Sequence, residues 1–515
     1  MNPIEIHGDR LTLEEIERVA AADAPALVLS DRARRAIAAA REMVDAAIRE
    51  GRVVYGLNTG FGALAEVVIP PDRIEELQEN LIRSHAAGVG EPLPEAEVRA
   101  IMLLRANVLA LGYSGVRPEI VELLLGMLNR RVHPVVPARG SVGASGDLAP
   151  LSHIALVLMG EGEAVVAGER MPGGAALERA GLEPVRLLAK EGLALNNGTQ
   201  AMTGVGALAL LAAERAVETA EVAGAMSLEA LRGTPDAFDD EIQRARPQPG
   251  QAESAGRLRA LLRDSEIRES HRENDPRVQD AYSLRCMPQV HGAARQAFRY
   301  IRGVLEVEAN SATDNPLIFP ESGRILSGGN FHGQPIAQVL DLLAIACADL
   351  GAISERRLAR LVDPAVSGLP AFLTPEPGTS SGFMMAQIVA ASLVSELKLR
   401  AAPASTDTIP TDANKEDHVS MGMAAALKAR DAVRLLETVL ALEVLAAAQG
   451  LDFLRPLRPG RGAERAWTLV RERVAPLQRD RVLGPDIAAV EALVRSGALA
   501  ALWQGNVDGT RPTAP

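Results

Sequence analysis

The feature that most constrains this chain is a set of long, Ala- and Leu-rich stretches with helical periodicity after about residue 199. They cover residues 199–232, 289–309, 335–363, 381–401 and 417–449. Helices of globular proteins average about 11–12 residues, so stretches of this length indicate the helices of a large bundle. Aromatic residues make up only 3% of the chain, so the core of the bundle must be aliphatic. The sequence therefore predicts a mainly α fold.

The first 198 residues have a more mixed pattern. Thr12 followed by Glu15 is a capping-box pattern, and Ser30 is placed to cap a helix that runs to about residue 49. Further helices are expected over residues 73–85, 95–111 and 118–129, with a small β element around 160–174. We expect two domains: an N-terminal domain over residues 1–198 with minor β elements, and a long-helix bundle domain over 199–515.

The composition indicates which classes of partner and which cellular compartment are compatible with this chain. The formal net charge is −12 and no run of Lys or Arg offsets it, which argues against a nucleic-acid partner. Cys286 and Cys347 cannot make a disulfide framework, which suits a reducing cytoplasm. The first ten residues lack the apolar segment of a signal peptide, and the apolar stretch 339–348 is interrupted by Asp341. We expect a soluble cytoplasmic protein with no membrane partner.

The segment 140–150, Gly-Ser-Val-Gly-Ala-Ser-Gly-Asp-Leu-Ala-Pro, departs from the helical rhythm. A flexible linker would be polar on both sides, but this segment leads directly into the apolar stretch 148–159. It is therefore predicted to be a Gly-rich loop held against a core. A serine-hydrolase nucleophile elbow needs Gly-x-Ser-x-Gly, and Asp147 occupies the last position of that pattern, so this alternative fits poorly.

A compressed Ala144-Ser145-Gly146 loop has a specific chemistry available to it. Gly146 lacks a side chain, so its amide nitrogen can approach the carbonyl carbon of Ala144 closely. Closing that bond and losing two waters, one of them from Ser145, gives a methylidene-imidazolone ring. Such a ring is an electrophile built from the chain itself.

The run 143–153, Gly-Ala-Ser-Gly-Asp-Leu-Ala-Pro-Leu-Ser-His, resembles the signature of the histidine and aromatic amino-acid ammonia-lyase family. The resemblance extends from about residue 55 to residue 421. It implies the fold of that family, an N-terminal domain carrying the loop and a long central helical bundle. It also implies a methylidene-imidazolone formed autocatalytically from Ala144, Ser145 and Gly146, with no diffusible cofactor, and a homotetramer whose sites are shared between subunits. The eight histidines show no His-x-x-x-His pair, so no metal is expected.

The resemblance assigns the proton-transfer role to a tyrosine. The segment 54–62, Val-Tyr-Gly-Leu-Asn-Thr-Gly-Phe-Gly, looks like the mobile lid of the family, and Tyr55 in it would be the base that removes the β-proton. A phenol can do this only if its pKa is lowered or its anion is stabilised nearby. Tyr282 is also placed for this role, so both tyrosines stay open as the base.

Other residues are assigned by the same resemblance to substrate binding. Asn197 would hold the polar head of the amino acid, although Asn before a long helix is also a common N-cap. Arg285 is the expected carboxylate clamp, since its planar guanidinium can make two parallel hydrogen bonds. Gln279 and Tyr282 would complete the pocket, and Phe331 would pack against the prosthetic group and the substrate.

Two polar residues direct the choice of substrate toward L-histidine. His85 and Glu416 match the positions that the histidine-specific branch directs at imidazole, although either could merely satisfy a helix end. Leaving imidazole nitrogens unpaired in an apolar pocket would cost about 1–3 kcal/mol each. Lys415 and Asn196 depart from the usual pattern of the family. The expected reaction is elimination of ammonia from L-histidine to give trans-urocanate. The alternatives are a phenylalanine or tyrosine ammonia-lyase, an aminomutase, or a catalytically dead helical scaffold.

Overall fold

The structure is a computed structural model that describes residues 3–275 and 277–506. The chain forms two compact units. The first comprises Met1–Ala209, Ile301–Asp341 and Pro403–Leu427, and the second comprises Leu210–Tyr300, Leu342–Ala402 and Lys428–Pro515. The sequence-based division at residue 198 is simpler than this grouping, because the chain returns twice to the first unit.

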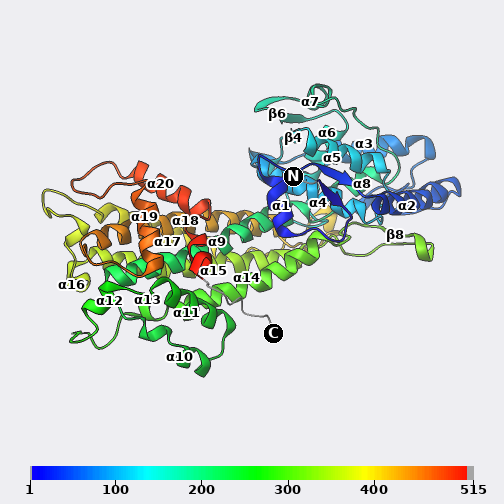
Figure 1. The fold of residues 1–515 in the computed structure, drawn as a ribbon. Helices are drawn as coiled ribbons and strands as arrows, with labels where there is room; N and C mark the ends of the chain where they lie inside the picture. The colour runs from blue at the N-terminus through cyan, green and yellow to red at the C-terminus, as the bar shows by residue number, and fades with distance from the viewer. Residues whose placement is uncertain (1–2, 276, 507–515) are drawn as a thin grey trace. The chain divides into compact units, whose positions relative to one another are not determined.

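The first unit begins with helices whose ends are set by local side chains. The Thr12 hydroxyl accepts from the Glu15 amide while the Glu15 carboxylate accepts from the Thr12 amide, which confirms the predicted capping box of α1. The Ser30 hydroxyl likewise caps α2. The helices of this part are α1 Leu13–Ala20, α2 Asp31–Arg49, α3 Ile74–His85, α4 Glu95–Ala110, α5 Pro118–Asn129, α6 Leu148–Leu158, α7 Gly173–Arg179 and α8 Glu191–Asn196 (Figure 1).

Short paired strands connect the loops of the first unit. Strands β1 (Ile4–Ile6) and β2 (Leu27–Leu29) are parallel, whereas β3 (Val89–Pro92) and β5 (Pro137–Arg139) are antiparallel. The predicted β element is a three-stranded antiparallel sheet of β4 (His133–Pro134), β6 (Glu163–Val166) and β7 (Glu169–Pro172). The segment 311–330 contains an antiparallel hairpin of β8 (Leu317–Phe319) and β9 (Arg324–Leu326).

Four long helices carry the chain across the boundaries of the two units. They are α9 Gln200–Ala230, α14 Met287–Ala309, α15 Gln334–Val362 and α18 Gly422–Asp452. The pattern predicted each of them, and most ends fall within a few residues. The start of α18 is the exception: it was expected at residue 417, but the preceding residues form an irregular loop, and the helix begins only at Gly422.

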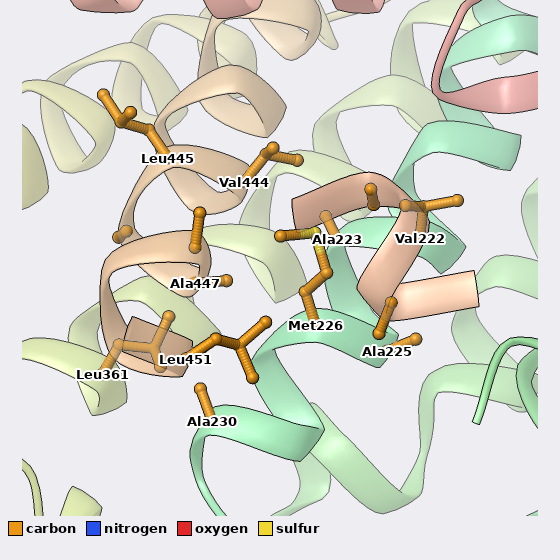
Figure 2. Packing of buried hydrophobic residues seen from close by; sticks show 14 of the residues in the cluster. Val222, Ala223, Ala225, Met226, Ala230, Leu361, Val444, Leu445, Ala447 and Leu451 are labelled. Carbon is orange, nitrogen blue, oxygen red and sulfur yellow. The ribbon is translucent and has the colours of Figure 1, made fainter. Parts of the chain in front are cut away.

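The second unit is helical throughout its described part. Besides its shares of the long helices it contains α10 Asp240–Ala245, α11 Pro249–Leu261, α12 Glu266–Ser270, α13 Tyr282–Arg285, α16 Pro364–Ser367, α17 Met384–Arg400, α19 Arg461–Arg471 and α20 Gly484–Arg495. Its core is aliphatic, as the composition requires. Figure 2 shows part of this cluster, in which small and branched side chains of α9 and α18 lie together with Met226. Alanines at these contacts allow the helices to approach closely.

One helix, α15, is long and apolar enough to cross a membrane. In its most apolar window, 67% of the residues are buried within the protein, as in the core helix of a bundle. Asp341 lies in this helix and is itself buried, where its carboxylate accepts a hydrogen bond from the Ser405 amide at 2.7 Å.

Candidate active site

A cavity of about 910 Å³ lies within the first unit. It is lined by the loop after α2, the end of α3, the Gly-rich loop before α6, the residue after α8 and the loop before α18. Most of the predicted site residues meet here: Tyr55, His85, Ala144, Ser145, Asn197, Phe331 and Glu416. Segments that are distant in the sequence therefore converge on one space.

The Gly-rich loop is pressed against the turn that joins α8 to α9. Gly146 has φ +71°, and a Cβ atom added there would overlap the carbonyl of Gly198. The Asp147 amide donates to the Gly198 carbonyl at 2.7 Å, so the two backbone segments are held in register. Only glycine fits at position 146.

Asp147 fixes this loop to the start of α9. Its carboxylate is completely buried and accepts hydrogen bonds from the Ser141 hydroxyl and the Met202 amide, both at 2.8 Å. Burial raises the pKa of Asp147 to about 6, although these hydrogen bonds favour the charged form. An acidic side chain also suits the positive end of the helix.

Asn197 does not cap α9, contrary to one interpretation of the sequence. It is the C-terminal cap residue of α8, in extended conformation, and it lies three residues before α9 begins. The Asp147 carboxylate instead accepts from the first turn of α9. The Asn197 Oδ1 atom is buried and has no hydrogen-bond partner in the described part of the chain. A buried polar atom without a partner beside a cavity is suited to a ligand.

Glu416 contacts the serine of the Gly-rich loop. The Ser145 Oγ donates to Glu416 Oε1 at 2.9 Å, and the Thr411 hydroxyl donates to Oε2 at 2.7 Å. Because α18 starts only at Gly422, Glu416 does not act as its cap. The Thr411 hydroxyl thus orients the carboxylate toward Ser145.

The segment around Tyr55 forms turns that lie over the cavity. The Tyr55 hydroxyl accepts from the Gly62 amide at 3.3 Å, and its ring meets Phe61 edge-on. The Asp412 carboxylate accepts from the Ala63 amide at 2.9 Å. Burial raises the pKa of Tyr55, and the nearby carboxylates of Asp412 and Glu416 raise it further. In this state Tyr55 is therefore a neutral phenol at neutral pH.

His85 is the last residue of α3, and its ring lies beside the cavity. The Ser84 hydroxyl and His85 Nδ1 are 2.9 Å apart. Burial lowers the pKa of His85, so its imidazole is neutral at pH 7 and can either donate or accept one hydrogen bond.

The loop that carries Phe331 is tied to the loop that carries Glu416. The rings of His332 and His418 stack with centroids 5.7 Å apart, and His332 Nε2 lies 3.2 Å from the His418 carbonyl oxygen. Phe331 lies next to His332 in this loop and lines the cavity.

Gln279, Tyr282 and Arg285 belong to the second unit and are not among the described residues that line this cavity. Tyr282 is 71% exposed, and the Arg285 guanidinium lies over its ring at 4.5 Å. Arg285 Nε donates to the Asp280 carbonyl at 2.9 Å. The expected carboxylate clamp is thus not part of the cavity described here.

Sequence reasoning missed three residues that shape the site. Asp412 holds the segment beside Tyr55, Asp147 ties the Gly-rich loop to α9, and Arg105 lies beneath the Asn197 carbonyl. Arg105 did leave a signal, since it is a charged residue in an apolar helical stretch. Asp412 left none, because its role depends on a contact between loops that are 349 residues apart.

Comparison with known proteins gives concordant results. Residues 11–472 match the family model described as aromatic amino acid lyase. The histidine ammonia-lyase of Anaeromyxobacter dehalogenans (strain 2CP-C) is 58% identical over 507 residues, which cover 97% of this chain and 100% of that protein. The crystal structure of histidine ammonia-lyase from Trypanosoma cruzi matches with a TM-score of 0.92 at 45% identity, covering 99% of this chain and 96% of that one. A tyrosine aminomutase from Streptomyces globisporus matches with a TM-score of 0.93 at 38% identity, covering 99% and 100%.

Proposed function

The chain belongs to the aromatic amino acid lyase family, and we propose from this that it eliminates ammonia from L-histidine to give trans-urocanate. The observation that carries the proposal is the contact of Ser145 Oγ with Glu416 Oε1, in a cavity that Tyr55 and His85 also line. The residues that would build the electrophile and those that would bind an imidazole are thus brought to one place.

The residues around Ala144-Ser145-Gly146 fit a methylidene-imidazolone. Gly146 lies in a space that a Cβ atom would overfill, and the buried Asn197 Oδ1 atom has no hydrogen-bond partner among the residues that the structure describes. The ring would supply an electrophile that accepts electrons from the substrate. When Ser145 loses its hydroxyl, Glu416 Oε1 loses its donor and is free for an N–H group of the substrate.

The polar residues of the cavity are suited to hold an imidazole ring. Glu416 can accept from one ring N–H, and neutral His85 can pair with the other ring nitrogen. Asn197 would bind the polar head of the amino acid. Tyr55 would take the β-proton, which requires its phenol to be deprotonated in the substrate complex. Departure of ammonia then leaves the conjugated product.

The carboxylate clamp would come from a neighbouring subunit. Arg285, Gln279 and Tyr282 are absent from the described cavity wall. From the family resemblance and the composition we propose a homotetramer in the cytoplasm, in which Arg285 of one subunit binds the substrate carboxylate in the cavity of another. Tyr282, exposed in the single chain, would enter the same site and remains the second possible base.

Phenylalanine, tyrosine or an aminomutase reaction remain the alternatives for this family. A phenyl ring would offer no hydrogen-bond partner to Glu416 Oε1 or to the second ring nitrogen of His85, at a cost of up to about 1–3 kcal/mol for each unpaired group. These two residues therefore favour histidine. A catalytically dead scaffold is disfavoured because Ser145, Tyr55 and Arg285 are all present.

Changing Ser145 to Ala tests the proposal, because it removes the hydroxyl that must leave. We expect ammonia release to fall by at least about a thousandfold, which corresponds to about 4 kcal/mol in the barrier. The segment containing Ala144 should then keep the mass of the unmodified peptide. Ser327→Ala, a matched change at another cavity-lining serine, should leave the mass loss of two waters intact. Full activity in Ser145→Ala would disprove the proposed electrophile.

A further inference from the structure

Arg105 is a buried charge in the first unit that the proposed reaction does not use. It lies on α4, a helix whose other residues from Val98 to Ala110 are all buried, and its own exposure is 1%. Burying a guanidinium is unfavourable unless acceptors compensate for the lost water. The few hydrogen-bond acceptors near Arg105 therefore indicate which part of the structure it stabilises.

The guanidinium of Arg105 makes its hydrogen bonds from one nitrogen. Nη1 donates to the Asn197 carbonyl at 2.8 Å and to Gln200 Oε1 at 2.9 Å. The Gln200 amide group in turn donates to the Thr313 hydroxyl at 2.7 Å. Nε and Nη2 are buried and have no hydrogen-bond partner among the described residues. The hydrogen bonds of Arg105 are thus made to the turn between α8 and α9 and to the first residue of α9.

The charge near Arg105 is only partly balanced. Asp314 forms an ion pair with Lys190 at 2.7 Å, and both side chains are completely buried. Asp314 also favours the charged form of Arg105, while burial lowers the pKa of Arg105 to about 10. The guanidinium consequently remains protonated at neutral pH. It is a fixed cation directly behind the Asn197–Gly198 peptide.

This peptide forms the wall against which the Gly-rich loop is pressed. The Gly198 carbonyl accepts from the Asp147 amide at 2.7 Å, and Gly146 packs so tightly on Gly198 that a Cβ atom would not fit. A displacement of Gly198 would therefore leave Gly146 free to shift as well. The hydrogen bond from Arg105 to the adjacent carbonyl opposes that displacement.

We propose that Arg105 is a positioning residue for the ring closure that makes the prosthetic group, an inference that rests on the proposed function. The Gly146 nitrogen bonds to the carbonyl carbon of Ala144. The Ala144 oxygen leaves as water with the amide protons of Gly146 and Ser145. The Ser145 hydroxyl leaves as a second water with the Cα proton of the same residue. No redox partner is needed, and Arg105 acts only by holding the wall in place.

The test compares two buried arginines of the same helix. Arg105→Met removes the charge and the hydrogen bonds while keeping much of the volume. Arg99→Met is the matched control, because Arg99 is 5% exposed and donates to the Val19 and Leu128 carbonyls, away from the loop. Arg105→Lys keeps the charge but has a single nitrogen. Each full-length protein is made by cell-free synthesis, and the mass of the peptide containing residues 144–146 is followed over time.

We expect Arg105→Met to lose the two waters roughly tenfold more slowly than the wild type or Arg99→Met, with Arg105→Lys in between. Ring closure at the wild-type rate in Arg105→Met, or equal slowing in Arg99→Met, would overturn the inference and leave the proposed function intact. If Arg105→Met does not fold, wild-type closure in Arg105→Lys overturns it. A wild-type peptide that never loses water would contradict the proposed function as well.

Discussion

At the residue scale, the site depends on contacts that bring a few polar groups to one side of a cavity. Glu416 is the clearest case, because its carboxylate lies between the Thr411 hydroxyl and the Ser145 hydroxyl. The resemblance of short motifs led to Glu416, His85 and Asn197 as site residues. The contacts of Arg105 and Asp412 could not be predicted, since their partners lie far away in the sequence.

Glu416→Ala should reduce the catalytic efficiency with histidine roughly a hundredfold, because an imidazole N–H in the cavity would lose its acceptor. Steady-state kinetics with L-histidine measures this, and peptide mass shows whether the ring has formed. Asp407→Ala alters an exposed carboxylate of the same loop that is not among the residues lining the cavity, and it should change the efficiency by less than about threefold, since surface charges contribute little. Equal effects of the two changes would argue against a specific role of Glu416.

At the element scale, the long helices could be predicted because helical periodicity and low aromatic content persist over many turns. The capping boxes and N-caps also left direct signals. The β8–β9 hairpin could not be predicted, because its strands are only three residues long. The start of α18 was misplaced because Glu416 and Asp417 look like the first turn of a helix, but they belong to the loop that lines the cavity.

The buried end of α9 carries a carboxyl group whose titration should affect stability. Glu229 accepts hydrogen bonds from the Ser265 hydroxyl and the Gly460 amide, and burial raises its pKa to about 7. A raised folded pKa means that the protonated form favours folding. This contribution is present at low pH and is lost as pH rises from the ordinary value of 4.5 through about 7.

Glu229→Gln removes this titration. Relative to the wild type, the variant should therefore become more stable as pH rises from about 5 to about 8, by up to about 3 kcal/mol. Melting temperatures at the two pH values measure the difference. Glu218→Gln, a change to a partly exposed residue of the same helix, is the control. A difference between Glu229→Gln and the wild type that is independent of pH would contradict the raised pKa.

At the scale of the whole molecule, a single chain does not explain how Arg285, the expected carboxylate clamp, reaches the substrate. The motif around Arg285 led to its prediction as a site residue, but a motif does not indicate which subunit's cavity the side chain enters. The described cavity contains Tyr55 and Glu416 and lacks Arg285. The site is therefore expected to need at least two subunits.

Mixed oligomers can test this directly. Tyr55→Phe and Arg285→Ala should each be nearly inactive, but co-expression should restore activity, because random assembly leaves about a quarter of the sites with both residues intact. Co-expression of Tyr55→Phe with Glu416→Ala gives the control, since these two residues line the same cavity. Every subunit of that mixture carries one of the two changes, so no cavity is intact and activity should not be restored. No rescue by Arg285→Ala would contradict the shared site.

The central claim is that this chain releases ammonia from L-histidine. The most direct measurement is an ultraviolet assay of the purified protein, run separately with L-histidine, L-phenylalanine and L-tyrosine. We predict that urocanate absorbance rises with histidine alone. Cinnamate or coumarate formation without urocanate would contradict the assignment of His85 and Glu416 to an imidazole ring.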